Sequence, residues 1–181
     1  MTLNSKFQEV SIGWTRGNSI VSKLIRRLDD SYFNHVYFKF TTNSNINLIY
    51  ESHLKGGVQV TPYEHLLSAK IHGKVEVIHE DKLDLSPEKV QLLWNDCLPH
   101  HGAEYDTRQI LIYYAWIRLF RRKKGAKVLK LHKKGSYTCN ELVVAAGKGI
   151  IPEFKDTDLS YTPEALFRLM HEGQTSKAMF G

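Results

Sequence analysis

The residue whose type and position most clearly indicate chemical reactivity is Cys139, which lies just before the apolar run 142–146. Thr138 is followed three residues later by Glu141, a capping-box pattern that predicts a helix beginning at Cys139 with Thr138 as its N-cap. A thiol in the first turn of a helix lies in the positive end of the helix dipole, which favours the thiolate. The pattern therefore has two interpretations, a nucleophilic thiol or a small buried side chain in the core.

A possible base for this thiol is His35, the first residue of a predicted strand over residues 35–40. A second strand is predicted over residues 46–52, and together they form a hairpin. If residues whose numbers sum to 86 pair, His35 lies opposite Glu51; if the sum is 88, it lies opposite His53. Either partner can hold one ring nitrogen and leave the other to take a proton from sulfur, and Glu51 supplies the better chemistry. A structural or surface histidine is the alternative interpretation, since the chain has nine histidines.

These residues need elements to position them, and hydrophobic periodicity and capping residues predict such elements along the whole chain. The predicted helices cover residues 19–29, 86–98, 106–120 and 139–147, with a last helix from Thr162 onward, and the predicted strands cover residues 35–40, 46–52, 57–61 and 74–79. No internal repeat or low-complexity linker divides the chain. We therefore expect one domain over residues 1–181, with a frayed tail over residues 171–181.

The composition is that of a globular protein, with 181 residues of which 42% are hydrophobic. The chain has no apolar run long enough to cross a membrane and no basic start followed by an apolar stretch, so we expect no signal peptide and a cytoplasmic protein at synthesis. A phage-encoded hydrolase carried in the virion would share these properties. The chain has only two cysteines, Cys97 and Cys139, so we do not expect a fold stabilised by a set of disulfides.

The positive net charge of +6 comes from one segment, which begins at Arg118 and ends at Lys134. This basic segment holds nine Lys and Arg and no acidic residue, so the rest of the chain carries 6 − 9 = −3. It could bind an anionic surface such as anionic lipid or an acidic wall polymer, or it could be a solvated loop. Nucleic acid is not an expected partner, because no nucleic-acid-binding motif accompanies the charge.

The sequence predicts no metal site and no cofactor. Asp96, Cys97, His100 and His101 gather metal-binding side chains, but the spacing lacks the second pair that completes a tetrahedral zinc site. A glycine-rich phosphate loop is also missing, so nucleotide chemistry has no support.

Several short motifs occur in a fixed order along the chain. They are His35-Val36, Ile49-Tyr50-Glu51-Ser52, Gly57-Val58, Tyr105-Asp106 and Thr138-Cys139-Asn140-Glu141. In this order, over about Gly13 to Leu169, the chain resembles the permuted papain-like amidases. These are circularly permuted relatives of the NlpC-type cell-wall cysteine peptidases, and the YiiX-like proteins are one branch of them.

The resemblance implies an α+β, papain-like fold in which an antiparallel sheet packs against the helix that bears the nucleophilic cysteine. By matching positions, Cys139 would be the nucleophile, His35 the general base and acid, and Glu51 the orienter. Tyr105 falls in a family motif and would contact the oxyanion or the substrate, although a core tyrosine is the plainer interpretation. His53 follows Glu51 where the family usually has a small residue, which makes it an alternative orienter.

The family's chemistry implies a thiol-dependent hydrolase that cleaves an amide bond, in a peptidoglycan peptide or an acylated small molecule, through an acyl-enzyme. A first alternative is hydrolysis or transfer of an acyl group at a membrane surface, as in the related lecithin:retinol acyltransferase-like proteins. A second alternative is a non-catalytic binding module that uses the basic segment.

Overall fold

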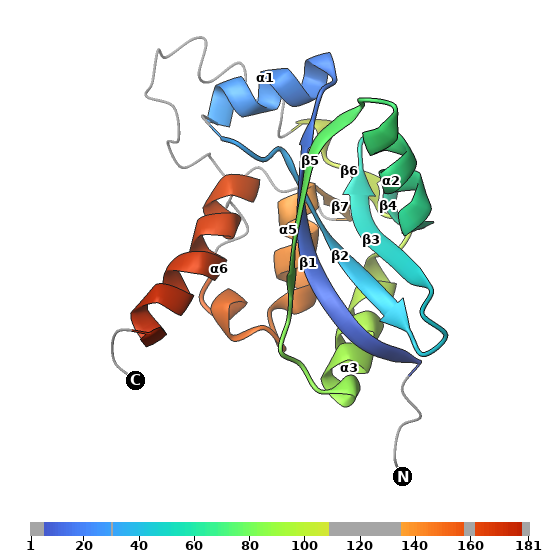
Figure 1. Cartoon of the computed structure of the whole chain (residues 1–181), viewed down its shortest axis with the longest axis vertical. Coiled ribbons are helices and arrows are strands. Elements are labelled where there is room, and N and C mark those ends of the chain that lie inside the picture. Colours follow the sequence, from blue (N-terminus) through green and yellow to red (C-terminus); the bar gives the residue numbers. More distant parts are fainter. Residues whose placement is uncertain (1–5, 30, 109–134, 158–161, 179–181) are drawn as a thin grey trace.

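The computed structural model of the chain describes residues 6–29, 31–108, 135–157 and 162–178. Its centre is a five-stranded antiparallel sheet with the strand order β4-β3-β2-β1-β5 (Figure 1). The strands are β1 (Phe7–Gly17), β2 (His35–Thr42), β3 (Asn47–His53), β4 (Gly57–Pro62) and β5 (Val75–Lys82). Two short strands, β6 (Glu104–Tyr105) and β7 (Ser136–Tyr137), form a separate parallel pair. The predicted α+β class is confirmed.

Helices lie on both sides of this sheet (Figure 1). Their bounds are α1 (Ile20–Asp29), α2 (Tyr63–Ile71), α3 (Pro87–Cys97), α5 (Cys139–Gly147) and α6 (Pro163–Ala178). Helix α5 contacts β2 and β3, α3 contacts β1, and α2 contacts β3, β4 and β5. The core is formed by the apolar sheet face and the helices α3 and α5, and it includes Trp14, Phe38, Leu93 and Leu142. The helix that begins at Cys139 is therefore held in the core.

The sequence did not predict β1 or α2. Strand β1 is mostly buried, and Val10, Ile12 and Trp14 alternate there with small or polar residues, so the period of two was present in the sequence and was missed. Helix α2 has no buried residue, so it lacks the apolar stripe from which an amphipathic helix is predicted.

Other predicted elements differ from the structure in their extent. Strand β5 continues to Lys82 rather than residue 79, because its pairing with β1 continues to Ser11. Helix α6 continues to Ala178, although a frayed tail was expected from residue 171; no proline interrupts this stretch. Most of the helix predicted over 106–120 and the whole basic segment lie outside the described residues. No helix among the residues that the structure describes has the length and apolar character needed to cross a membrane.

The β2–β3 hairpin has the register in which paired residue numbers sum to 88, as in the pair Phe38 and Tyr50. The pairing with a sum of 86 was therefore wrong. The register is set by the turn: the Thr42 amide donates to the Ile46 carbonyl, which encloses three residues, and Asn45 takes a positive φ of 60°. A three-residue hairpin loop characteristically needs a left-handed residue at this place, which asparagine tolerates.

Candidate active site

The first turn of α5 positions Cys139 through the predicted capping box. The Thr138 amide and the Thr138 hydroxyl both donate to Glu141 Oε2, at 2.9 and 3.0 Å. Because Glu141 is itself buried, this carboxylate fixes the start of the helix inside the protein rather than at its surface. Cys139 is only 3% exposed, and its Sγ lies 3.8 Å from Asn140 Oδ1.

His35 and Glu51 form the closest polar contact near this helix, with 2.7 Å between His35 Nε2 and Glu51 Oε2. The second oxygen of Glu51 accepts a hydrogen bond of 3.3 Å from Gln59 Nε2 on the neighbouring strand. Both carboxylate oxygens are thus held, and the carboxylate in turn holds one nitrogen of the imidazole. Nδ1 of His35 is left to interact with another group.

That other group is the thiol of Cys139, which lies close enough to the imidazole to affect the pKa of His35. Burial acts to lower the pKa of His35, but the hydrogen bonds to Cys139 and Glu51 and their negative charges outweigh it and raise this pKa to about 10. Burial likewise acts to raise the pKa of Glu51, while the hydrogen bond and charge of His35 lower it to about 2. An imidazolium beside the Glu51 carboxylate is the protonation state that this arrangement stabilises.

Glu51 reaches His35 although the two residues are not directly opposite each other. The observed β2–β3 pairs end at Phe38 and Tyr50, and the same register extended along both strands puts His53 opposite His35; the two rings lie 6.4 Å apart in an edge-to-face arrangement. The exposed His53 accepts a hydrogen bond of 3.4 Å at Nδ1 from the Lys55 amide, and burial lowers its pKa. Of the two predicted orienters, the structure therefore brings Glu51 into hydrogen-bonding distance and places His53 beside the imidazole edge.

Two contacts that the sequence did not predict support this geometry. Ser52 is fully buried, and its hydroxyl donates to the Tyr137 carbonyl at 2.7 Å. This bond ties the strand of Glu51 to the chain two residues before Cys139. Gln59 stands directly opposite Glu51 in the β3–β4 register and fixes the carboxylate from the other side. Neither residue has a sequence pattern that distinguishes it from an ordinary strand residue.

A polar layer beneath His35 also restricts the imidazole. The ring of Tyr37 is stacked against His35 with 6.3 Å between centroids, and the Tyr37 hydroxyl donates to Glu80 at 2.7 Å. Lys39 pairs with the same Glu80 carboxylate. Gly13 makes room for the tyrosine, since a Cβ on Gly13 would lie 2.3 Å from the Tyr37 ring.

Tyr105 lies on the strand that pairs with the segment leading into α5, with Tyr105 opposite Tyr137. The Asp106 amide also donates to the Tyr137 carbonyl, at 3.3 Å. The side chain of Tyr105 is half-buried. The structure thus places Tyr105 one strand away from the segment that ends at Cys139, and its role remains a prediction.

The candidate zinc residues do not converge. Cys97 is fully buried at the end of α3, where burial, with a smaller effect of the Asp96 charge, raises the pKa of its thiol. His100 packs instead on the ring of Tyr137. Among the described residues, the group whose donor atoms could hold a metal ion is His79, Asp81 and His171, which lie within 4.8 Å of one another.

The fold is that of a class of α+β proteins represented among solved structures. The chain is similar to the crystal structure of the metalloprotein yiiX from Escherichia coli O157:H7, with a TM-score of 0.55, 19% sequence identity, and coverage of 92% of this chain and 82% of that one. Neither a protein-family model nor a curated protein sequence matches the chain. The shared fold agrees with the YiiX-like resemblance of the sequence.

Proposed function

We propose that this protein is a thiol-dependent hydrolase that cleaves an amide bond through an acyl-enzyme on Cys139. The observation that carries the proposal is the position of one imidazole, His35, between the Cys139 thiol and the Glu51 carboxylate. A nucleophile, a base and a group that orients the base are the parts that acyl transfer requires.

In this mechanism, His35 holds the proton of Cys139 and the sulfur attacks the carbonyl carbon of the substrate. The C–N bond then breaks, the leaving amine takes the proton from His35, and a thioester remains on Cys139. Water attacks the thioester with His35 as base, which releases the acid and restores the thiol. Glu51 keeps the imidazole in place and stabilises its positive charge, and the amide of Cys139 at the helix start can donate to the oxyanion.

The resemblance to permuted papain-like amidases supports a cell-wall peptide or an acylated small molecule as the substrate. Within that family, acyl-group hydrolysis or transfer at a membrane surface uses the same three side chains. The basic segment of the binding-module alternative lies outside the described residues. The site geometry serves either acyl-transfer reaction, and the resemblance makes amide hydrolysis the first reaction to test.

The first experiment measures iodoacetamide alkylation of each cysteine against pH by peptide mass spectrometry. We expect fast modification of Cys139 well below pH 8, because an imidazolium stabilises a thiolate. In His35→Ala this modification should slow by roughly tenfold or more, while Cys97, which is buried, should remain unmodified in both proteins.

Matched variants complete this test. Cys139→Ala should remove labelling and amidase activity and keep the fold, whereas Cys97→Ala should keep both labelling and activity. An ordinary thiol profile at Cys139, or labelling that follows Cys97, would overturn the proposal.

A further inference from the structure

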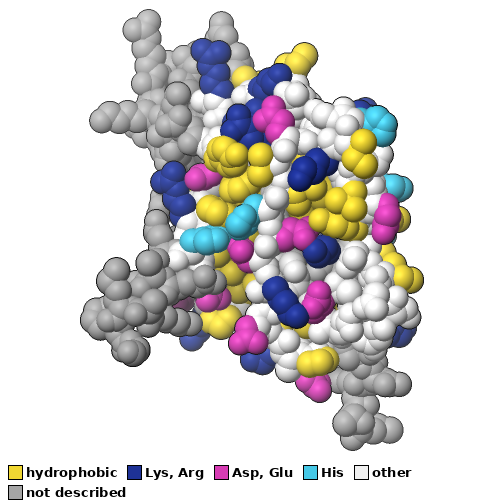
Figure 2. Space-filling view, in the orientation of Figure 1, with side chains coloured by type: hydrophobic (Ala, Val, Ile, Leu, Met, Phe, Trp, Pro, Cys, Tyr) yellow, Lys and Arg dark blue, Asp and Glu magenta, His cyan; other side chains and the backbone are white. Residues whose placement is uncertain are grey.

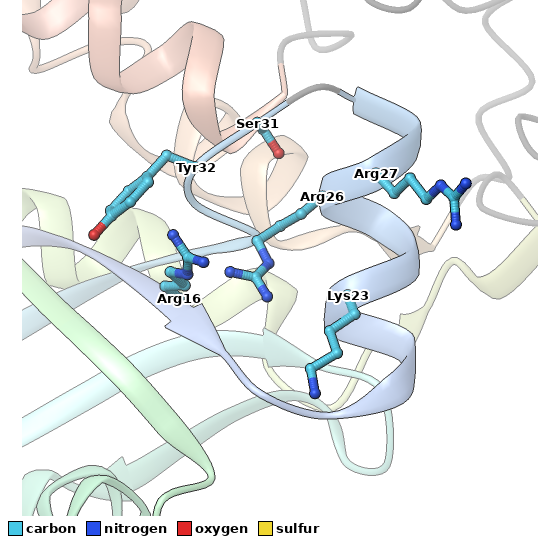
Figure 3. Close-up of a pocket in the computed structure, with 6 residues that line it drawn as sticks. All are labelled: Arg16, Lys23, Arg26, Arg27, Ser31 and Tyr32. Carbon is cyan, nitrogen blue, oxygen red and sulfur yellow. The ribbon is translucent and has the colours of Figure 1, made fainter.

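At the end of the sheet where β1 ends and β2 begins lies a cationic pocket, which we define by its lining residues. They are Arg16, Lys23, Arg26, Arg27, Ser31 and Tyr32, around a cavity of about 370 Å³. Figure 2 shows Lys and Arg side chains gathered over α1 and the adjoining end of the sheet. In Figure 3, Arg16, Lys23 and Arg26 lie around the cavity between β1 and α1.

The pocket has more positive charge than its described contacts neutralise. Arg16 Nε donates to Glu76 Oε2 at 2.6 Å, and a terminal nitrogen of Arg26 lies 3.7 Å from the same oxygen. One carboxylate oxygen is thus shared by two guanidinium groups, and Lys23 adds a third positive charge. Basic residues near the end of a helix are favourable by themselves, so the charge alone does not define a ligand site.

The second observation concerns hydrogen bonding. Arg26 is 12% exposed, and its Nε has no hydrogen-bond partner within the part of the chain that the structure describes. The hydroxyl of Ser31, also buried and lining the cavity, has none in the same described residues. A buried N–H of a charged group without an acceptor is costly, and both unpaired groups can donate. An acceptor with several oxygens would satisfy them together.

The arginine geometry also fits an oxyanion. The Arg16 guanidinium is stacked over the Tyr32 ring at 4.7 Å, which fixes its plane and leaves its edge for hydrogen bonds. Planar guanidinium groups bind carboxylate and phosphate through paired hydrogen bonds.

The pocket lies at the end of the sheet where His35 begins β2. Thr15 pairs with His35, and Arg16 follows Thr15 directly. The connection is held by Asn34, whose amide donates to the Thr15 carbonyl at 3.1 Å and whose Oδ1 accepts from the Gly17 amide at 2.7 Å. The loop that carries Tyr32 therefore continues without a break into the strand of the proposed base.

From these contacts we infer that the cationic pocket binds an oxyanion of the substrate, a carboxylate or a phosphate group, and so selects anionic acyl or peptide substrates for the reaction at Cys139. This inference rests on the proposed function. The anionic group would bind to Arg16, Lys23, Arg26 and the Ser31 hydroxyl, which holds the remainder of the substrate at the same end of the sheet as His35.

The test begins with the pocket itself. Inorganic phosphate and, in a separate arm, acetate are titrated into 15N-labelled protein at constant ionic strength, and the Arg Nε–H signals and the Ser31 and Tyr32 amides are followed by NMR. We expect saturable shifts, with affinity reduced roughly tenfold in Arg26→Gln. Saturation by phosphate alone identifies a phosphate ester as the group, and saturation by acetate identifies a carboxylate.

Lys23→Gln and Lys70→Gln provide the matched comparison, because both replace an exposed helical lysine and only Lys23 lines the pocket. We expect Lys23→Gln to weaken anion binding and Lys70→Gln to leave it unchanged. Absence of a saturable shift with either anion, or an equal loss in the two variants, would overturn the inference.

A second readout connects the pocket to the thiol. The ratio of Cys139 alkylation by iodoacetate to that by iodoacetamide should fall about twofold in Lys23→Gln and not in Lys70→Gln, because removing a positive charge weakens the attraction of the anionic reagent. An unchanged ratio in Lys23→Gln would contradict the link to catalysis. Anion binding does not depend on Cys139, so failure of the proposed function would appear as an ordinary thiol profile with the phosphate shifts intact.

Discussion

At the scale of single residues, the site depends on how one imidazole is shared. Glu51 binds Nε2 of His35, and Gln59 holds the second carboxylate oxygen, so the ring cannot rotate without breaking a buried hydrogen bond. The remaining nitrogen interacts with Cys139. This arrangement makes the charge of Glu51, rather than only its shape, important for the protonation of His35.

Replacing that charge gives the first prediction at this scale. In Glu51→Gln, the pKa of His35 should fall by roughly one unit or more, because a nearby negative charge is removed. The pKa is measured from the His35 ring signals by NMR titration. Glu64→Gln, at an exposed position on α2, is the control and should not move it. A His35 titration that is the same in Glu51→Gln and wild type would contradict the role of Glu51.

At the scale of elements, one buried hydrogen bond joins the strand of Glu51 to the helix of Cys139. Ser52 on β3 donates to the carbonyl of Tyr137 on β7, and α5 begins two residues later. A side-chain bond at this point determines where the helix starts relative to the strand. Gly57, at the start of β4, lets the chain pass close to another segment: its φ is +64°, and a Cβ there would lie 2.2 Å from the Ala103 carbonyl oxygen.

Ser52→Ala should therefore affect both stability and the thiol. We expect a loss of about 0.5–1.5 kcal/mol in the free energy of unfolding, because the Tyr137 carbonyl loses the Ser52 donor and keeps the Asp106 amide. We also expect slower alkylation of Cys139, since the start of α5 is no longer tied to β3. Urea denaturation and alkylation kinetics measure the two effects. Ser11→Ala, a buried serine on β1, serves as the control and should leave the alkylation rate unchanged.

At the scale of the whole molecule, the pair of His35 and Glu51 makes the free energy of unfolding depend on pH. His35 has a raised pKa in the folded protein, so its contribution to stability is fully present below about pH 6.5 and is lost as pH rises through about 10. Glu51 has a lowered pKa, so its contribution is present above about pH 4.5 and is lost as pH falls through about 2. Both contributions are complete only between pH 4.5 and 6.5.

The stability difference between wild type and Glu51→Gln should follow this window. Urea denaturation at pH 5.5 should give the largest difference in unfolding free energy, and the difference should shrink as pH approaches 10. Glu64→Gln should show no such pH dependence. A difference between wild type and Glu51→Gln that is constant from pH 5.5 to 10 would show that the pair does not carry the predicted linkage.

The sequence by itself determined the parts of this protein that depend on neighbouring residues. Thr138 and Glu141 are three positions apart, so their capping box could be recognised in the sequence and it forms in the structure. The alternation of side chains that begins at His35 predicted the strand β2. Helical and strand periodicities both occur along the chain, as expected for the α+β fold that is observed. These features are local because the atoms involved lie within one turn or one strand.

Only the tertiary structure decided which distant residues meet. The turn at Asn45 selected a register in which Glu51 is not opposite His35, and the Glu51 side chain nevertheless reaches the imidazole. Hairpin periodicity, which is the same for both registers, could show neither. The contact of Ser52 with Tyr137 joins residues 85 positions apart, and no periodicity encodes such a pair. Arg16 and Ser31 likewise line one pocket although they belong to different elements, and no sequence pattern indicates that they meet. Long-range packing selects these contacts, since each needs the whole sheet and its helices in place.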